Sequence, residues 1–181
     1  MELITQDVRK MIKFLKIIII ILIISPKVLM SADMSGYLLN KAIEEFNNKN
    51  YESAYKSLTN IAPTGNPVAN YLLGQMYLKG LGIEPNYKIA YDKILYSSQK
   101  LFKHDKSLAI ESQITLSNMY ANGIGTDIDE SKAYMWSFIA YKTSENIHLT
   151  YLESLQSSIA TEDIKNIEEK GLRLLKNIIK D

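Results

Sequence analysis

Two serine–lysine pairs are the residues whose types and spacing come closest to a known chemistry. Ser53 and Ser97 each precede a lysine by three positions, Lys56 and Lys100, which is the spacing of a serine acyl-enzyme motif. The Ser-Asp-Asn and Lys-Thr-Gly elements that accompany this motif are absent from the sequence. A chain with this many serines and lysines contains one or two such pairs by chance. We expect both pairs to lie on the solvated faces of helices, and we predict no acyl-enzyme chemistry.

The other titratable residues form no pattern typical of catalysis or metal binding. The sequence has no Cys, which excludes thiol nucleophiles, disulfides and Cys-ligated metals, and its two His, His104 and His148, are predicted to lie on the surface. Adjacent carboxylates diverge by about 100° on a helix and should face solvent; these are Glu44-Glu45, Glu162-Asp163 and Glu168-Glu169. The Gly-x-Gly turns follow predicted helices, so they are not dinucleotide fingerprints. We therefore expect no catalytic residue, no metal and no cofactor.

The N-terminal segment must be separated from the folded part before the fold is considered. Residues 1–32 contain basic residues followed by an unbroken apolar run from Ile17 to Ile24, which is the layout of a signal peptide. Eight helical residues span about 12 Å, whereas the hydrocarbon core of a membrane is roughly 30 Å thick. The sequence predicts cleavage after Ala32 and a periplasmic or secreted protein. An uncleaved inner-membrane anchor and a start at Met11 remain alternatives.

Removal of this segment changes the charge balance of the chain. The whole sequence has a net charge of +1, but residues 1–32 hold five of the basic and only two of the acidic side chains. The remainder is slightly acidic, with a net charge of about −2. A chain of this charge has no overall basic field for nucleic acid. We predict no nucleic-acid partner, and membrane contact only through the N-terminal segment if it is uncleaved.

An internal repeat organises the rest of the sequence. Seven residues recur in register at an offset of 43: Leu73, Met76, Tyr77, Gly80, Gly82, Ala90 and Tyr91 return as Leu116, Met119, Tyr120, Gly123, Gly125, Ala133 and Tyr134. A weaker match at an offset of 36 relates residues 50–55 to residues 86–91. A fixed period of this length is the signature of a solenoid, in which each unit buries its apolar face against its neighbours.

Each unit is predicted to be a helix, a loop and a second helix. In the first unit the leading helix begins at Pro67 and ends at Gly80, which can adopt a left-handed conformation, and Asn86 precedes the second helix. In the second unit Asp127 or Asp129 can cap the equivalent helix. Small residues are expected where two helices approach closely, namely Gly74, Ala90, Ser117 and Ala133. The repeated tyrosines, Tyr77, Tyr91, Tyr120 and Tyr134, are predicted to pack in the core.

These motifs resemble the Sel-one-like repeat (SLR) family of tetratricopeptide-like solenoids. The resemblance rests on the segments 73–83 and 116–126, each followed by an Ala-containing helix, and on Lys132-Ala-Tyr-Met-Trp136. The matching positions are Leu73, Gly74, Tyr77, Gly80, Gly82, Ala90, Leu116, Tyr120, Gly123, Gly125, Ala133 and Trp136. The first repeat keeps Ala90 but has Lys93 in place of the Trp. Ordinary tetratricopeptide units are the alternative. The resemblance implies an all-α, right-handed α-solenoid of antiparallel helix hairpins with about eight helices.

The predicted solenoid covers residues 37–180. We divide it into a divergent first hairpin at 37–61, repeat 1 at 67–101, repeat 2 at 109–142 and C-terminal capping helices at 146–180. Thr161 is a candidate N-cap of the last helix, with Glu162 and Asp163 in its first turn. We expect this helix to be a cap, because a terminal unit of a solenoid exposes one face to water.

The helical phase of the first helix in each repeat predicts a binding surface. Five side chains are predicted to point away from the core and to line the concave surface: Asn70, Tyr71, Gln75, Gln113 and Asn118. Together with the predicted export and the resemblance to the SLR family, this surface predicts a non-enzymatic scaffold of the bacterial envelope that binds a segment of another protein. The same resemblance implies two alternatives, a secreted, host-directed effector and a penicillin-interacting envelope hydrolase.

Overall fold

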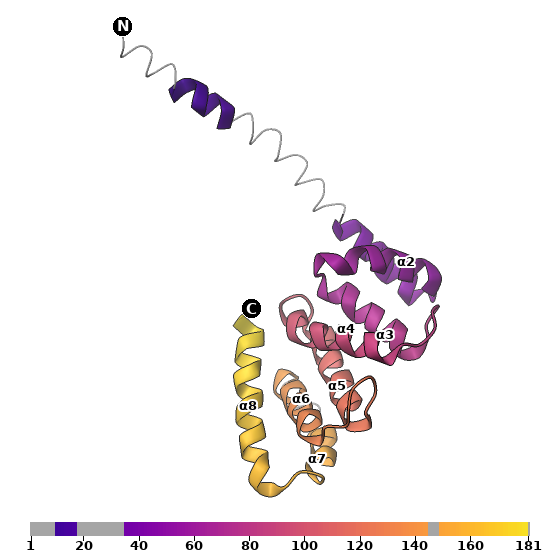
Figure 1. Ribbon diagram of the computed structural model, residues 1–181, viewed down its shortest axis with the longest axis vertical. Coiled ribbons are helices and arrows are strands. Elements are labelled where there is room, and N and C mark those ends of the chain that lie inside the picture. Colours follow the sequence, from indigo (N-terminus) through magenta and orange to yellow (C-terminus); the bar gives the residue numbers. More distant parts are fainter. Residues whose placement is uncertain (1–9, 18–34, 145–148, 181) are drawn as a thin grey trace. The chain divides into compact units, whose positions relative to one another are not determined.

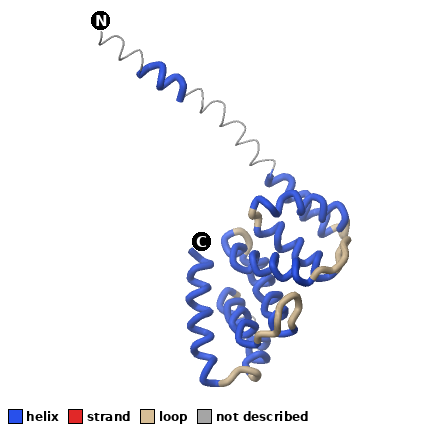
Figure 2. Tube along the Cα trace, viewed as in Figure 1, coloured by secondary structure: helices blue, strands red, loops and turns tan. Residues whose placement is uncertain are grey.

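The described part of the chain is helical. The computed structural model describes residues 10–17, 35–144 and 149–180, and no strand occurs within these ranges (Figures 1 and 2). The chain divides into two compact parts, Met1–Lys41 and Ala42–Asp181. Residues 10–17 are helical, whereas nearly all of the apolar run and Ala32 of the predicted signal peptide lie outside the described residues. Among the described helices, none combines the length and the apolar character needed to cross a membrane.

The helices follow the predicted repeat. Residues 35–47 are helical and precede α2 (Tyr51–Ile61), and α3 (Pro67–Lys79) and α4 (Tyr87–Lys100) form the first repeat. The second repeat consists of α5 (Lys106–Asn122) and α6 (Glu130–Thr143), and α7 (Leu149–Gln156) and α8 (Thr161–Lys180) follow. Short 3-10 turns, η1 (Ala62–Thr64) and η2 (Leu101–Lys103), end the hairpins. The most extensive contacts join α3 to α4 and α5 to α6, with α4 packed on α5. The predicted α-solenoid is confirmed.

Side-chain caps begin most of these helices. Asn86 accepts a hydrogen bond from the backbone N–H of Ile89 at 3.0 Å, and Asp129, rather than Asp127, accepts one from Lys132 at 2.8 Å. The predicted N-cap at Thr161 is wrong, because Thr161 is already the first residue of α8. The chain turns one residue earlier, where the carbonyl of Ala160 accepts from the N–H of Asp163 at 2.9 Å.

The glycine loops set the spacing between successive units. Gly80 has the left-handed backbone predicted for it, and Gly82, Gly123 and Gly125 have it as well, with φ between 67° and 72° in all four. A Cβ atom on Gly82 would lie 2.6 Å from Cβ of Tyr51 in the preceding hairpin, and one on Gly125 would overlap the carbonyl group of Tyr87. Each loop therefore lies directly on the first turn of the preceding unit's second helix.

Close helix contacts occur at the predicted small residues. A Cβ on Gly74 would meet Cδ1 of Ile94 at 2.8 Å, so α3 and α4 approach closely there. At the equivalent place in the second repeat, Ser117 is buried and donates a hydrogen bond to the carbonyl of Ala133 at 2.6 Å. The hydroxyl thus finds an acceptor inside the α5–α6 contact.

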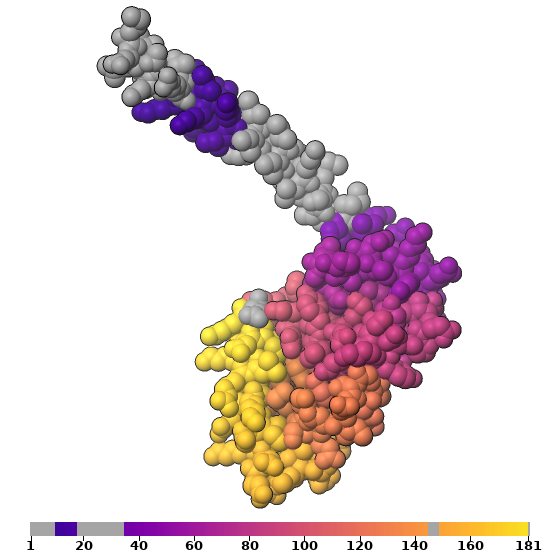
Figure 3. All heavy atoms as spheres, in the orientation of Figure 1, coloured from indigo at the N-terminus to yellow at the C-terminus, as the bar shows by residue number. Residues whose placement is uncertain are grey.

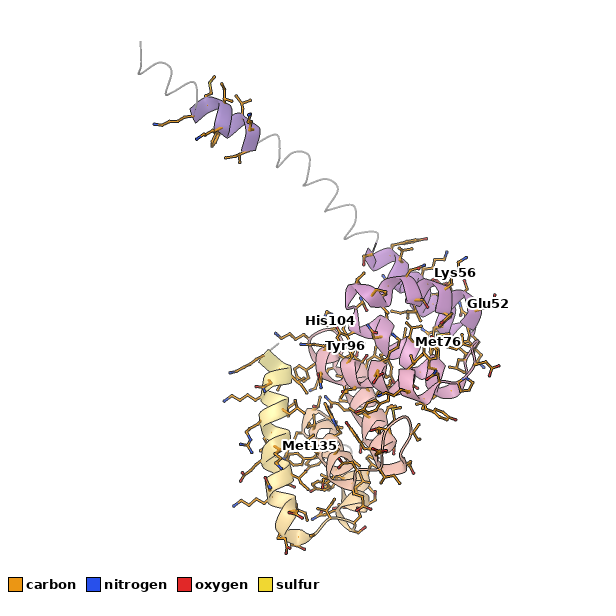
Figure 4. All side chains as sticks on the ribbon, viewed as in Figure 1. Glu52, Lys56, Met76, Tyr96, His104 and Met135 are labelled. Atoms are coloured by element: carbon orange, nitrogen blue, oxygen red, sulfur yellow. The ribbon has the colours of Figure 1, made fainter. Side chains whose placement is uncertain are left out.

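An apolar cluster joins the second repeat to the last two helices. Its buried members are Tyr134, Phe138, Leu152 and Ile167, from α6, α7 and α8. Gly171 lets α8 approach α6 closely, since a Cβ at this position would lie 3.1 Å from the ring of Phe138. Met135 lies between α6 and α8 (Figure 4). The C-terminal helices are therefore packed on the second repeat.

Candidate functional site

The two serine–lysine pairs do not form a reactive site. Ser53 donates its hydroxyl proton to the carboxylate of Glu45 at 2.8 Å. Ser97 was predicted to face solvent, and this is wrong: it is fully buried and donates to the carbonyls of Pro67 and Lys93. The error arises because α4 packs on both α3 and α5, which cover this turn of the helix. Both hydroxyl protons therefore go to oxygen acceptors, the carboxylate of Glu45 for Ser53 and backbone carbonyls for Ser97.

Within the described residues, the histidine and carboxylate side chains form no metal-binding cluster either. His104 is exposed in the connection after η2, and His148 lies outside the described residues. Within the ranges that the structure describes, no three His, Cys, Asp or Glu side chains are grouped so that they could hold a metal ion.

The side chains predicted to contact a partner differ in burial. Tyr71 and Gln75 of α3 are only 5% and 6% exposed, Asn70 is buried, and Gln113 of α5 is fully buried, whereas Asn118 is exposed. The expectation that all five point away from the core is therefore wrong for four of them. The physical reason is that α3 packs against α2, α4 and α5, so that neighbouring helices cover most of its surface. Their contact with a partner stays a prediction.

A line of hydrogen bonds connects the first helices of successive units. The hydroxyl of Tyr71 donates to the carboxylate of Glu111 at 2.9 Å, and the amide of Gln75 donates to the hydroxyl of Thr115 at 3.5 Å. These two contacts join α3 to α5. We call the surface formed by Tyr71, Gln75, Glu111, Thr115, Asn118 and Tyr151 the first-helix face.

The line continues from α5 to α7. The hydroxyl of Tyr151 donates to Oδ1 of Asn118 at 2.7 Å and lies 3.2 Å from the hydroxyl of Ser117. Glu111 and Asn118 are exposed and Thr115 is half-buried. The accessible part of the first-helix face therefore belongs to α5, and its side chains are held by partners on α3 and α7.

The tyrosines of this face remain neutral donors over the physiological range. Burial raises the pKa of Tyr71, and the negative charge of Glu111 raises it further. Burial also raises the pKa of Tyr151. A neutral phenol keeps its proton for the bond to Glu111 or Asn118, so these contacts are independent of pH near neutrality.

Sequence reasoning missed three residues of this face: Glu111, Thr115 and Tyr151. Both bonds between α3 and α5 join residues 40 positions apart. This separation is three residues, or about one helical turn, shorter than the repeat offset of 43. The repeat length could therefore have indicated Glu111 and Thr115, whereas Tyr151 lies beyond the clear repeat and gives no such signal.

A second set of contacts links the units through the repeated tyrosines. The hydroxyls of Tyr55 and Tyr77 lie 2.8 Å apart, and those of Tyr91 and Tyr120 lie 2.7 Å apart, with the rings edge to face in both pairs. The bond to Tyr55, together with burial, raises the pKa of Tyr77 to about 12. In the second repeat a tyrosine–glutamate hydrogen bond takes the place of the tyrosine pair: Tyr134 donates to Glu168 of α8 at 2.9 Å. These tyrosines therefore join one unit to the next.

Known proteins share these repeats and this fold. The Sel1 repeat model matches residues 67–92 and 110–142. A search of curated proteins found no match. A protective antigen of uropathogenic Escherichia coli with an SLR fold shares 17% identity and a TM-score of 0.70, over 82% of this chain and 32% of its own. A Sel1 repeat protein from Oxalobacter formigenes shares 27% identity and a TM-score of 0.56, over 65% of this chain and 45% of its own.

The matched repeats are the two helix–loop–helix units described above. Residues 67–92 contain α3, its glycine loop and the first turns of α4, and residues 110–142 contain most of α5 and α6. This chain spans less than half the length of either similar structure. The sequence motifs, the helix pairs and these similarities agree: the chain carries two Sel1 repeats and has the SLR fold.

Proposed function

We propose that this protein is a non-enzymatic scaffold that binds a segment of another protein on its first-helix face. Sel1 repeat proteins generally mediate protein–protein interaction and are typically not enzymes. The observation that carries the proposal is the fixed orientation of exposed polar groups on α5. Glu111 and Asn118 each accept a hydrogen bond from a tyrosine of a neighbouring helix. Such fixed groups bind a partner with little loss of side-chain entropy.

The chemistry of the face favours an extended peptide segment. Tyr151 bonds only the side-chain oxygen of Asn118, so the two N–H donors of this amide do not contact Tyr151. Glu111 keeps one carboxylate oxygen, because Tyr71 donates to the other. Half-buried Ile114 lies on the same helix and offers an apolar surface. Donors, acceptors and an apolar side chain along one helix match the alternating backbone and side-chain groups of an extended peptide.

Position-specific photo-crosslinking tests the binding surface. A photo-reactive residue is placed at Asn118 in one protein and at Asn166, an exposed asparagine of α8, in the matched control. We expect a crosslink from position 118 to one identifiable protein, and its loss when Thr115→Arg is added. Equal crosslinking from both positions, or none from position 118, would contradict the proposed face. Labelling of Ser53 by a β-lactam probe would contradict the non-enzymatic assignment.

We also infer that the protein is exported. Support comes from the basic residues and apolar run of residues 1–32, which have the layout of a signal peptide. Fractionation of producing cells tests this inference: recovery from the periplasm favours an envelope adaptor, and recovery from the medium favours a secreted effector. Recovery with the inner membrane indicates an uncleaved anchor. Retention in the cytoplasm would refute export.

A further inference from the structure

Charge is segregated along α8. Its first nine residues contain four acidic side chains and one lysine, and its last eleven contain four cations and no acidic residue; the cations are Lys170, Arg173, Lys176 and Lys180. The helix dipole favours cations only within the last turn. Lys170 and Arg173 lie farther from the end of the helix, so the dipole does not account for them.

Apolar side chains are exposed among these cations. Leu172 is 48% exposed and Ile179 is 46% exposed, and Lys176 lies between them at helical spacing. The three therefore share one face of α8. Gly171 and Ile178, which directly precede Leu172 and Ile179 and lie about 100° round the helix from them, are buried. Figure 3 shows α8, in yellow, open to solvent along its length.

The connection after α4 adds more positive charge beside the end of α8. Lys103 donates from Nζ to the carbonyl of Lys180 at 2.7 Å. A cavity of about 190 Å³ lies there, with His104, Tyr96 and Ile178 in its lining. Figure 4 labels His104 and Tyr96 at this place. The nearest described carboxylate on this connection, Asp105, accepts from the N–H of Leu108 at the start of α5. We define the basic face as Lys103, Leu172, Arg173, Lys176, Ile179 and Lys180.

We propose that the basic face binds the surface of a membrane that contains anionic phospholipid. Four or more cations beside an exposed helix are typical of binding to anionic lipid, and each lysine near such a surface strengthens binding by about fivefold. The exposed Leu172 and Ile179 can enter the headgroup region, as the apolar residues of an interfacial helix do. This proposal uses no residue of the first-helix face and does not depend on the proposed function.

An anionic membrane fits the basic face better than an acidic peptide does. The cations are mostly lysines, which are flexible point charges without the fixed geometry that binds individual carboxylates. They lie on the exposed side of a helix together with apolar side chains. A lipid surface can contact the C-terminal half of the helix, residues 170–180, and satisfy both kinds of side chain at once.

Vesicle co-sedimentation of the full chain tests this proposal. Binding is compared on vesicles of phosphatidylcholine alone and of phosphatidylcholine mixed with phosphatidylglycerol. The test variant is Lys176→Glu with Lys180→Glu, and the control with the same charge change is Lys56→Glu with Lys165→Glu. All four lysines are exposed. The basic segment at residues 10–17 is identical in both variants, so their difference reports the basic face.

We expect the unaltered chain and the control to bind the mixed vesicles, and the test variant to bind at least tenfold more weakly, as about fivefold per charge implies. Added salt should weaken the binding, because it screens exposed charges. Leu172→Ser with Ile179→Ser should also weaken it, which separates lipid insertion from simple charge attraction. Circular dichroism checks that each variant is folded.

Three outcomes would overturn the proposal. The first is equal binding of the test variant and the control to mixed vesicles. The second is equal binding of the unaltered chain to neutral and mixed vesicles, or binding to neither. The third is binding of polyglutamate that is lost in the test variant while vesicles are not bound, because the face would then recognise an acidic protein.

Discussion

At the scale of single residues, an equivalent buried amide is hydrogen-bonded in the first repeat and has no hydrogen-bond partner in the second. Asn70 donates to two backbone carbonyls and accepts from Lys93 at 3.1 Å. Its counterpart Gln113 is fully buried, and neither its amide nitrogen nor its oxygen has a hydrogen-bond partner. In the second repeat Trp136 occupies the position of Lys93, so the amine that would bond the amide is missing. Gln113 therefore bears an uncompensated cost of burial.

Replacement of this amide by an apolar side chain of similar size should stabilise the protein. We expect Gln113→Met to raise the free energy of unfolding by about 1–2 kcal/mol, because it removes two unpaired polar atoms. Urea denaturation measures the change. The matched variant Asn70→Leu should lower stability, since it removes three bonds. A loss of stability in Gln113→Met as large as that in Asn70→Leu would contradict this account.

The pairing of Tyr55 with Tyr77 predicts a change of stability at alkaline pH. The pKa of Tyr77 rises from 10.0 to about 12 in the folded protein. Between these values the unfolded chain ionises Tyr77 first, so the free energy of unfolding should fall as pH rises from 10 to 12. Tyrosinate absorbance and urea denaturation across this range measure both effects.

The phenylalanine variant isolates the contribution of the hydrogen bond. Tyr55→Phe should make Tyr77 ionise at lower pH and reduce the loss of stability. Tyr37→Phe, at an exposed position, serves as the control. An unchanged titration of Tyr77 in Tyr55→Phe would show that the pair does not set its pKa.

At the scale of elements, the glycine loops determine how closely successive units stack. Gly125 needs both a left-handed backbone, with φ of 71°, and the absence of a side chain against the backbone of Tyr87. Gly82 meets the same two needs against Tyr51. The Gly-x-Gly spacing thus places the second glycine at the contact between units, after the first has ended the helix.

Substitution of the contact glycine should separate the units. We expect Gly125→Ala to cost at least about 2 kcal/mol, because the left-handed conformation alone costs an alanine about 1–2 kcal/mol and the methyl group would overlap Tyr87. Thermal denaturation measures the loss. In Gly36→Ala the new Cβ meets nothing within 4 Å, and no loss is expected. Equal stability of the two variants would refute the assigned role of the loop.

At the scale of the whole helical unit, α8 connects distant parts of the chain. It packs along α6 through the apolar cluster and reaches η2, where Lys103 bonds its last turn (Figure 1). In a solenoid each unit contacts mainly its neighbours, so stability is distributed along the stack. The contact with η2 adds a link between the end of the first repeat and the last helix.

Loss of the apolar cluster should loosen the C-terminal helices first. We expect Phe138→Ala to cost about 3–5 kcal/mol and to reduce hydrogen-exchange protection in α7 and α8 more than in α3. Leu58→Ala, at a fully buried position of α2, should instead affect the first hairpin. A uniform loss of protection in both variants would show that the unit unfolds as a single cooperative body.

The sequence by itself determined the repeat, the helix pairs, the left-handed Gly80 and the cap at Asn86, because these depend on local backbone preferences and on residue spacing. It left the cap of the equivalent helix in the second repeat open between Asp127 and Asp129. It did not determine which polar side chains are accessible. Helical phase gives the direction of Tyr71 and Gln75 from the axis of α3, but α5 covers them there and bonds both. Only the tertiary structure decided this, because burial depends on which neighbouring helices cover each face.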